Sequence, residues 1–237
     1  MKQLINNLLI LIISLALAIS IPFYFHEILV FGVVKIGLGW VVTTVLIRLA
    51  VILFFLFALN AILLIIRKGV RPRFLILLAI GIVPGFLISF AIEPIYDIDY
   101  FMLGDELELT EFDRLAEASS NSYTRQDTTE ILAFFDVGCD HCQAACNKLG
   151  LNIEAGQTIP VHVFFANDTA NVNHFLETNN GLALNSHFLQ SENTFVSFAG
   201  FEFPSIFLID STGKTVYHWI GERMNYSALD YLLSLEQ

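Results

Sequence analysis

All three cysteines of the chain lie within one eight-residue segment, Cys139-Asp-His-Cys142-Gln-Ala-Ala-Cys146. This segment follows closely on the apolar run 131–135, which predicts a buried strand. A buried strand that ends in C-x-x-C and opens a helix is typical of thiol–disulfide redox chemistry. Because no cysteine lies elsewhere, no structural disulfide framework can form outside this segment. Thiol chemistry is therefore the chemistry that the sequence best supports.

The C-x-x-C spacing predicts different roles for two of the thiols. Cys139 is expected at the start of a helix, where unpaired N–H groups and the helix dipole favour a thiolate, so it is the predicted nucleophile. Cys142, one turn further on, is the predicted resolving thiol that closes the disulfide. A protonated His141 would favour the Cys139 thiolate and make the disulfide more oxidising. Asp140 and the acidic charge of the domain act the other way, so the direction of electron transfer stays open.

Cys146 lies four residues after Cys142 and seven after Cys139, so a helix places the three sulfurs on one stripe. Two interpretations stay open: an inert, buried core thiol, or a third redox thiol or metal ligand. A zinc site needs a second ligand pair, and the sequence has no second C-x-x-C and no H-x-x-x-H.

Apolar runs and turn residues predict the elements that must position these thiols. The expected order is β-α-β-α-(insert)-β-β-α, with the helix of the cysteines ended by Gly150 and the next helix capped by Asn167 or Asp168. The phenylalanine-rich segment 188–203 is expected in the core, with a substrate groove and an exposed aromatic rim beside Pro204. The predicted strands are 130–135, 161–166, 205–209 and 215–219, and the predicted helices are 139–149, 168–178 and 227–235.

Charge and hydropathy divide the chain into two halves. Residues 1–93 hold seven Lys/Arg and two Asp/Glu, whereas residues 94–237 hold five Lys/Arg and 21 Asp/Glu. The strongly acidic second half argues against a nucleic-acid partner. The apolar content of 55% is too high for one soluble domain and is concentrated in the first 95 residues. We expect a membrane region at 1–95, an acidic linker with a short helix (110–118) at 96–128, and a folded domain at 129–237.

The apolar half predicts about three transmembrane helices. The spans are expected at Leu4–Ile21, retained rather than cleaved, at Val42–Ile66 and at Phe74–Ile92, with 28–39 as an interfacial or re-entrant segment. The loop 67–73 holds four positive charges, which places it in the cytoplasm and the acidic half outside, where disulfides persist. Arg48 in the second span is either functional, or snorkels or pairs with an acidic residue.

Three local features resemble the thioredoxin superfamily. They are the C-x-x-C after the first core strand, the segment Phe203-Pro204-Ser205 where the family has its cis-proline loop, and the strand and turn at 206–214. From Thr129 onward the chain resembles membrane-anchored periplasmic oxidoreductases of the TlpA/ResA kind, although Gly138 stands where the family has a tryptophan. The resemblance implies an α/β thioredoxin-like domain after an all-α membrane region, a cis bond before Pro204, and a role for Pro204 in positioning the partner strand.

The expected protein is thus a multi-pass protein of the bacterial inner (cell) membrane, with its C-terminal domain periplasmic or extracellular. It would exchange thiols and disulfides with protein substrates without a cofactor, and its further partners would be the lipid bilayer and a membrane electron donor. One alternative is a copper chaperone that resembles the Sco proteins, using Cys142, Cys146 and a histidine, with His187 and His218 the nearest candidates. The other is a non-catalytic membrane adaptor whose thioredoxin-like domain serves for docking.

Overall fold

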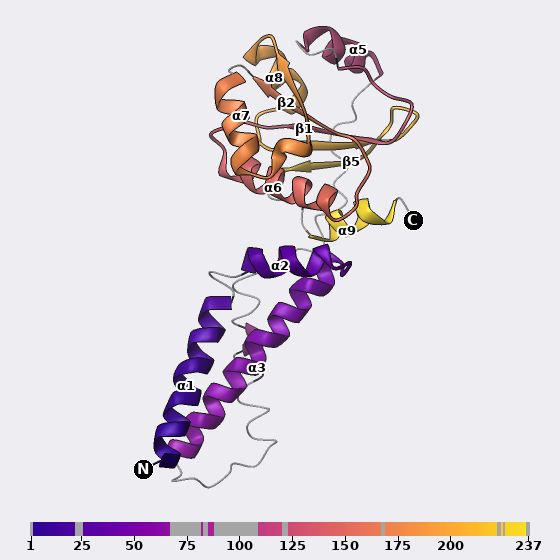
Figure 1. Cartoon of the computed structure of the whole chain (residues 1–237). Coiled ribbons are helices and arrows are strands. Elements are labelled where there is room, and N and C mark those ends of the chain that lie inside the picture. Colours follow the sequence, from indigo (N-terminus) through magenta and orange to yellow (C-terminus); the bar gives the residue numbers. More distant parts are fainter. Residues whose placement is uncertain are drawn as a thin grey trace. The chain divides into compact units, whose positions relative to one another are not determined.

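The computed structural model describes residues 2–21, 26–66, 82, 85–87, 109–119, 123–166, 169–221, 224 and 226–235. The chain divides into two compact units, Met1–Ile95 and Tyr96–Gln237 (Figure 1). The first contains the helices α1 (Lys2–Ser20), α2 (His26–Lys35) and α3 (Trp40–Ile66).

Helices α1 and α3 are long and apolar enough to cross a membrane, by length and composition. The two helices pack against each other, and small or polar side chains such as Ser14, Ala58 and Ala61 are buried there. Large apolar side chains, among them Leu53 and Phe57, are exposed instead. Such an arrangement suits a helix pair that is surrounded by lipid, where small residues allow close packing.

Two of the three predicted spans thus correspond to helices, and α3 begins two residues before the predicted span. The third predicted span, 74–92, lies largely outside the described residues, and the basic loop 67–73 lies wholly outside them. Segment 28–39 includes most of α2. Arg48 is buried within the first unit, with 7% of its surface exposed.

The second unit is built around a five-stranded sheet of order β3-β2-β1-β4-β5. Its central strands β1 and β2 are parallel, β3 runs parallel to β2, and β4 and β5 are antiparallel to their neighbours. All five residues of β1 are buried, which explains why its sequence is apolar almost throughout. The strands are β1 (Glu130–Phe134), β2 (Val161–Ala166), β3 (Asn185–Leu189), β4 (Ser205–Ile209) and β5 (Thr215–Ile220).

Helices lie on both faces of this sheet (Figure 1). On one face, α5 and α8 join a core that includes Phe112, Leu132, Phe164, Phe198 and Phe207. The short helix predicted at 110–118 is therefore confirmed, and it packs into the same core as the strands. On the other face, α6 contacts α9 and α7 packs its Phe175 ring against the sheet. The helices are α5 (Leu109–Ala118), α6 (Asp140–Glu154), α7 (Thr169–Thr178), the 3-10 turn η3 (Gly181–Ala183), α8 (Glu192–Ala199) and α9 (Tyr226–Ser234).

The predicted end of the cysteine helix at Gly150 is wrong, because α6 continues to Glu154. Gly150 is needed for a different reason. A Cβ atom at this position would lie 1.9 Å from the backbone oxygen of Asn180, so only glycine lets the segment before η3 approach the helix so closely. The remaining predicted strands and helices are present within one or two residues. The insert between α7 and β4 consists of η3, β3 and α8, while the predicted caps Asn167 and Asp168 lie outside the described residues.

Candidate active site

Cys139 is the N-cap residue of α6. Its backbone is extended (φ −94°, ψ 117°), and its Sγ accepts a hydrogen bond from the backbone N–H of Cys142 at 3.2 Å. A cap residue faces N–H groups that have no partner within the helix. The sulfur therefore sits in the positive field at the helix start, and it is half-buried, so a partner can reach it. This is the placement that the sequence predicted for the nucleophile.

The turn before Cys139 is held by Asp136, a residue that the sequence analysis did not single out. Its carboxylate Oδ1 accepts from the N–H of Gly138 at 2.7 Å, and its carbonyl accepts from the N–H of Cys139 at 3.2 Å. Aspartate commonly accepts from the backbone two residues on. The Asp-x-Gly pattern at 136–138 was the signal that could have predicted this turn.

Cys142 lies one turn into α6 and is fully buried. Burial raises the pKa of its thiol, and the hydrogen bond with Cys139 raises it further, while a backbone hydrogen bond from Asp136 acts in the opposite direction. Cys142 is thus held as a neutral thiol next to the accessible Cys139. The two cysteines of the motif have different environments, as an attacking and a resolving thiol require.

Cys146 lies deeper along the same helix and is also fully buried. Burial raises the pKa of its thiol to about 12. Its sulfur packs so closely on η3 that a Cβ at Gly181 would lie 2.6 Å from Sγ. This close packing is what the core-thiol interpretation of Cys146 expects.

The segment before β4 passes directly over Cys139. The peptide bond between Phe203 and Pro204 is cis, as the resemblance predicted. The thiol of Cys139 donates to the carbonyl oxygen of Phe203 at 3.7 Å. The structure therefore brings the Phe203–Pro204 peptide to the start of α6, next to Cys139, which lies 64 residues before Phe203 in the sequence. His141 lies between the two cysteines with an exposed side chain.

The phenylalanine-rich segment contributes both core and surface. Phe195 and Phe198 are buried, and Phe203 packs against Phe195 with ring centroids 5.3 Å apart. Phe201, at the turn between α8 and the cis peptide, is 90% exposed. One aromatic side chain next to the site is therefore exposed to solvent. The predicted substrate groove beside Pro204 stays a prediction.

His187 and His218, the histidines considered for a copper site, form other contacts. His218 Nε2 lies 2.7 Å from Ser205 Oγ, and His187 Nε2 lies 2.9 Å from His162 Nδ1. Among the residues that the structure describes, no three His, Cys, Asp or Glu side chains are placed to hold a metal ion.

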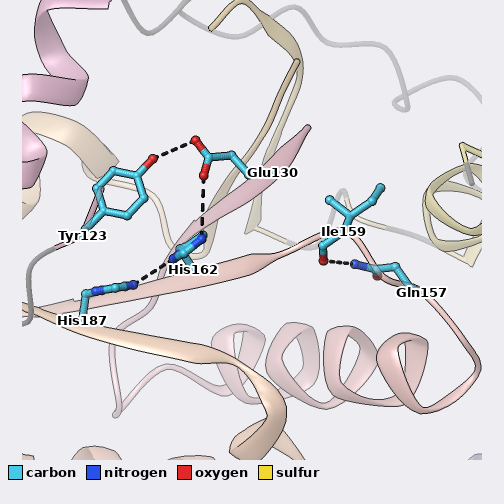
Figure 2. Close-up of polar contacts among 6 residues, drawn as sticks. All are labelled: Tyr123, Glu130, Gln157, Ile159, His162 and His187. Atoms are coloured by element: carbon cyan, nitrogen blue, oxygen red, sulfur yellow. Dashed lines mark hydrogen bonds and ion pairs between the residues drawn. The ribbon is translucent and has the colours of Figure 1, made fainter. Parts of the chain in front are cut away.

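Figure 2 shows a buried polar network that joins four segments of the domain. Tyr123 donates its hydroxyl to Glu130 Oε1 at 2.8 Å, Glu130 Oε2 lies 3.7 Å from His162 Nε2, and His162 contacts His187. Burial raises the pKa values of Tyr123 and Glu130. It lowers the pKa of His162, and burial together with the neighbouring His162 lowers the pKa of His187 to about 4. All four groups thus favour their neutral forms.

This network runs diagonally across the sheet. Glu130 is the first residue of β1, at the end away from the cysteines, which follow the last residue of that strand. His162 pairs with Leu132 in the middle of β1, and His187 pairs with Phe164, which itself pairs with Phe134 at the end of β1. Tyr123 belongs to the segment that joins α5 to β1, and an isolated bridge between Ser119 and Leu189 ties the same segment to β3. The network therefore fastens this segment to the sheet.

Several solved structures resemble the C-terminal half of the chain. A secreted disulfide oxidoreductase of Mycobacterium tuberculosis, described as homologous to E. coli DsbE, aligns with 46% of this chain and 83% of its own at 15% identity, with a TM-score of 0.39. StoA from Bacillus subtilis aligns with 49% of this chain and 92% of its own at 14% identity, with a TM-score of 0.40. The exposed lipoprotein thioredoxin Etrx1 of Streptococcus pneumoniae aligns with 49% of this chain and 95% of its own at 18% identity, with a TM-score of 0.38. No family model and no curated protein matches the chain.

The class of the C-terminal unit follows from its own topology. Strands β1 and β2 are parallel and joined through α6, β4 and β5 form an antiparallel hairpin, and α9 follows. Helix α6, which follows β1, begins at the C-x-x-C motif, and a cis-proline precedes β4. This unit has the thioredoxin-like α/β fold, and two apolar helices precede it in the chain.

Proposed function

We propose that the protein is a membrane-anchored thiol–disulfide oxidoreductase that acts on protein substrates through Cys139 and Cys142. The observation that supports this proposal best is the pairing of an accessible thiol at a helix start with a buried thiol one turn further on. The cis peptide beside Cys139 adds a backbone surface against which an extended partner can lie.

Each exchange uses the two thiols, the substrate disulfide and an acceptor for the proton of Cys142. In the reductive direction, the Cys139 thiolate attacks one sulfur of a substrate disulfide, and the other substrate sulfur leaves as a thiolate that takes up a proton. Cys142 then loses its proton and attacks Cys139 Sγ, which releases the second substrate thiol. Two electrons pass from the dithiol to the substrate, and Cys139 and Cys142 end as a disulfide. The oxidative direction is the reverse.

The environments of the two thiols give this sequence its order. Burial raises the pKa of Cys142, so this thiol stays protonated while Cys139 makes the first attack. Once Cys139 is bound to the substrate, its sulfur is neutral, and the proton of Cys142 must pass to a base or to solvent. Slow proton release would prolong the mixed disulfide, which makes this intermediate suitable for trapping.

For the cellular location, we propose that the thioredoxin-like domain lies outside the cytoplasm of a bacterial cell, in a multi-pass membrane protein. Supporting observations are the apolar helices α1 and α3 and the four positive charges at 67–73, because short cytoplasmic loops are enriched in Lys and Arg. An alkaline phosphatase fused after Gln237 is expected to be active. An inactive phosphatase together with a fluorescent cytoplasmic reporter at the same position would contradict this topology.

The direct test of the function is a trapping experiment in cells. In a Cys142→Ser variant the resolving thiol is lost, so mixed disulfides between Cys139 and its partners should accumulate and be identified by mass spectrometry. A Cys139→Ser/Cys142→Ser variant is the matched control and should trap nothing. If Cys139→Ser cells behave as wild type and no partner is trapped, the adaptor function is favoured. A copper ion that co-purifies with the wild type and is lost in Cys146→Ala would favour the chaperone.

A further inference from the structure

A buried polar pair lies directly behind the cis-proline loop. Ser205, the residue after Pro204, places its Oγ 2.7 Å from Nε2 of His218, and both side chains are buried. In the register of β4 and β5, Ser205 pairs with Ile220 and Phe207 pairs with His218. Ser205 and His218 are therefore diagonal neighbours on one face of the sheet, a spacing that a long side chain can bridge.

His218 is itself held in a fixed orientation. Its ring stacks on the ring of Phe207 with centroids 3.9 Å apart and planes at 12°. Phe207 in turn meets the edge of Phe134, the last residue of β1, at 6.0 Å. The imidazole is thus packed against buried aromatic rings of β4 and β1. This packing fixes the ring of His218 in the orientation that contacts Ser205.

Strand β5 also holds the loop through its backbone. The N–H of Gly221, the residue after β5, donates to the carbonyl of Pro204 at 2.8 Å. One residue before Pro204, the carbonyl of Phe203 accepts from the thiol of Cys139 at 3.7 Å. Residues 203–205 therefore connect the reactive sulfur to β5. The other two hydrogen bonds involve backbone atoms, whereas the bond between Ser205 and His218 joins two side chains. It can therefore be removed by substituting either residue or both.

We propose that His218 is a positioning residue for disulfide exchange, which acts by holding Ser205 and, through it, the Phe203–Pro204 peptide at a fixed place beside Cys139. This inference rests on the proposed function. A partner disulfide must align its two sulfurs with Cys139 for in-line exchange, and the loop is the protein surface next to that sulfur. Since misplacement by about 1 Å can cost up to about 100-fold in rate, a loop released on one side would slow exchange with a large substrate.

A purely structural role for the pair makes a different prediction. Ser205 Oγ and His218 Nε2 satisfy each other, and removing one partner leaves the other polar atom buried and unsatisfied. Replacing both partners by apolar groups of similar shape restores the balance. If the pair only stabilises the core, the double variant Ser205→Ala/His218→Phe should recover both stability and activity. If the pair positions the loop, only stability should recover.

The experiment compares Ser205→Ala, His218→Phe and the double variant in the full chain, purified in detergent, with dithiothreitol as electron source. Three quantities are measured: the midpoint of unfolding in urea, kcat and KM for reduction of insulin, and the rate at which iodoacetamide alkylates Cys139. Ser205→Thr retains the hydroxyl and serves as the conservative variant. Gln157→Ala is the stability control, since Gln157 bonds to the Ile159 carbonyl at 2.9 Å (Figure 2) beyond the far end of α6, about 20 Å from Cys139.

We expect the double variant to unfold near the wild-type midpoint but to lose about tenfold in kcat/KM for insulin. Its rate with the small reagent iodoacetamide should stay within about twofold of wild type, and Ser205→Thr should retain most of the insulin activity. A double variant with wild-type kcat/KM would overturn the inference, as would an equal loss of activity in Gln157→Ala. A wild-type protein that reduces no protein disulfide would instead overturn the proposed function, and this inference with it.

Discussion

Acid should destabilise the thioredoxin-like domain through the buried network, and His187 is the residue that reports it best. Burial and the neighbouring His162 lower the pKa of His187 from 6.5 to about 4. The unfolded chain therefore binds a proton at His187 that the folded domain excludes, at every pH between these two values. The contribution of the neutral imidazole is fully present above pH 6.5 and is lost as the pH falls through the window from 6.5 to 4.

The size of the effect follows from that pKa difference. One pKa unit corresponds to about 1.4 kcal/mol, so the shift amounts to roughly 3 kcal/mol across the whole window and roughly 2 kcal/mol between pH 7 and pH 5. The lowered pKa of His162 acts in the same direction. The raised pKa of Glu130 acts in the opposite direction, since its protonated form favours the folded state as the pH falls. The positive charge of Arg125 acts against this rise, because it lowers the pKa of Glu130.

The assay isolates the contribution of His187 by substitution. In His187→Gln, an amide can still bond to His162 but cannot titrate. Urea unfolding is followed by the fluorescence of Trp219 in a Trp40→Phe background at pH 7 and pH 5. Wild type should lose roughly 2 kcal/mol more than His187→Gln over this interval. The exposed His174 provides the control, since His174→Gln should behave as wild type. Equal losses of stability in wild type and His187→Gln would show that His187 is not the group that destabilises the domain in acid.

Three further predictions concern the cysteines and the core. Cys146→Ala should leave insulin reduction nearly intact while Cys139→Ser abolishes it, because Cys146 is buried and Cys139 is accessible; an equally inactive Cys146→Ala would favour a three-cysteine mechanism. Gly181→Ala should destabilise the domain by about 1–3 kcal/mol through overpacking, since its Cβ would lie 2.6 Å from Cys146 Sγ, and Cys146→Ala should relieve part of that loss in urea unfolding. Tyr123→Phe should cost about 1–3 kcal/mol because Glu130 Oε1 loses the hydroxyl that donates to it, and an unchanged unfolding midpoint would show that another group replaces the hydroxyl.

Four of the five strands could be predicted from the sequence. β1, β2 and β4 are mostly apolar runs, and their residues are almost all buried. The edge strand β5 could be predicted because a tight turn joins it to β4 in a hairpin. β3 was missed because it lies at the other edge of the sheet, begins with polar, partly exposed residues and follows no hairpin turn. A strand of this kind is defined by its neighbour rather than by its own pattern. Gly150 was misinterpreted for a related reason, since the backbone that approaches it comes from a distant segment.

The candidate site shows the same division between local and distant information. Cys139, Cys142 and Pro204 could be predicted because each lies in a short motif with a fixed place in the fold. The pair of Ser205 and His218 could not, because it depends on the register of two strands. The network of Figure 2 depends on the register of three strands and on where Tyr123 packs, so no local spacing in the sequence indicates it.

We propose that Cys139 and Cys142 form a reversible disulfide in which Cys146 takes no part. The most direct test equilibrates the full chain in detergent with glutathione buffers of graded ratio, alkylates the remaining thiols, and maps the peptides by mass spectrometry. We expect a single transition in which Cys139 and Cys142 lose two hydrogens together, while Cys146 is alkylated only after unfolding at every ratio. A disulfide that includes Cys146, or the absence of any disulfide across the whole range, would contradict it.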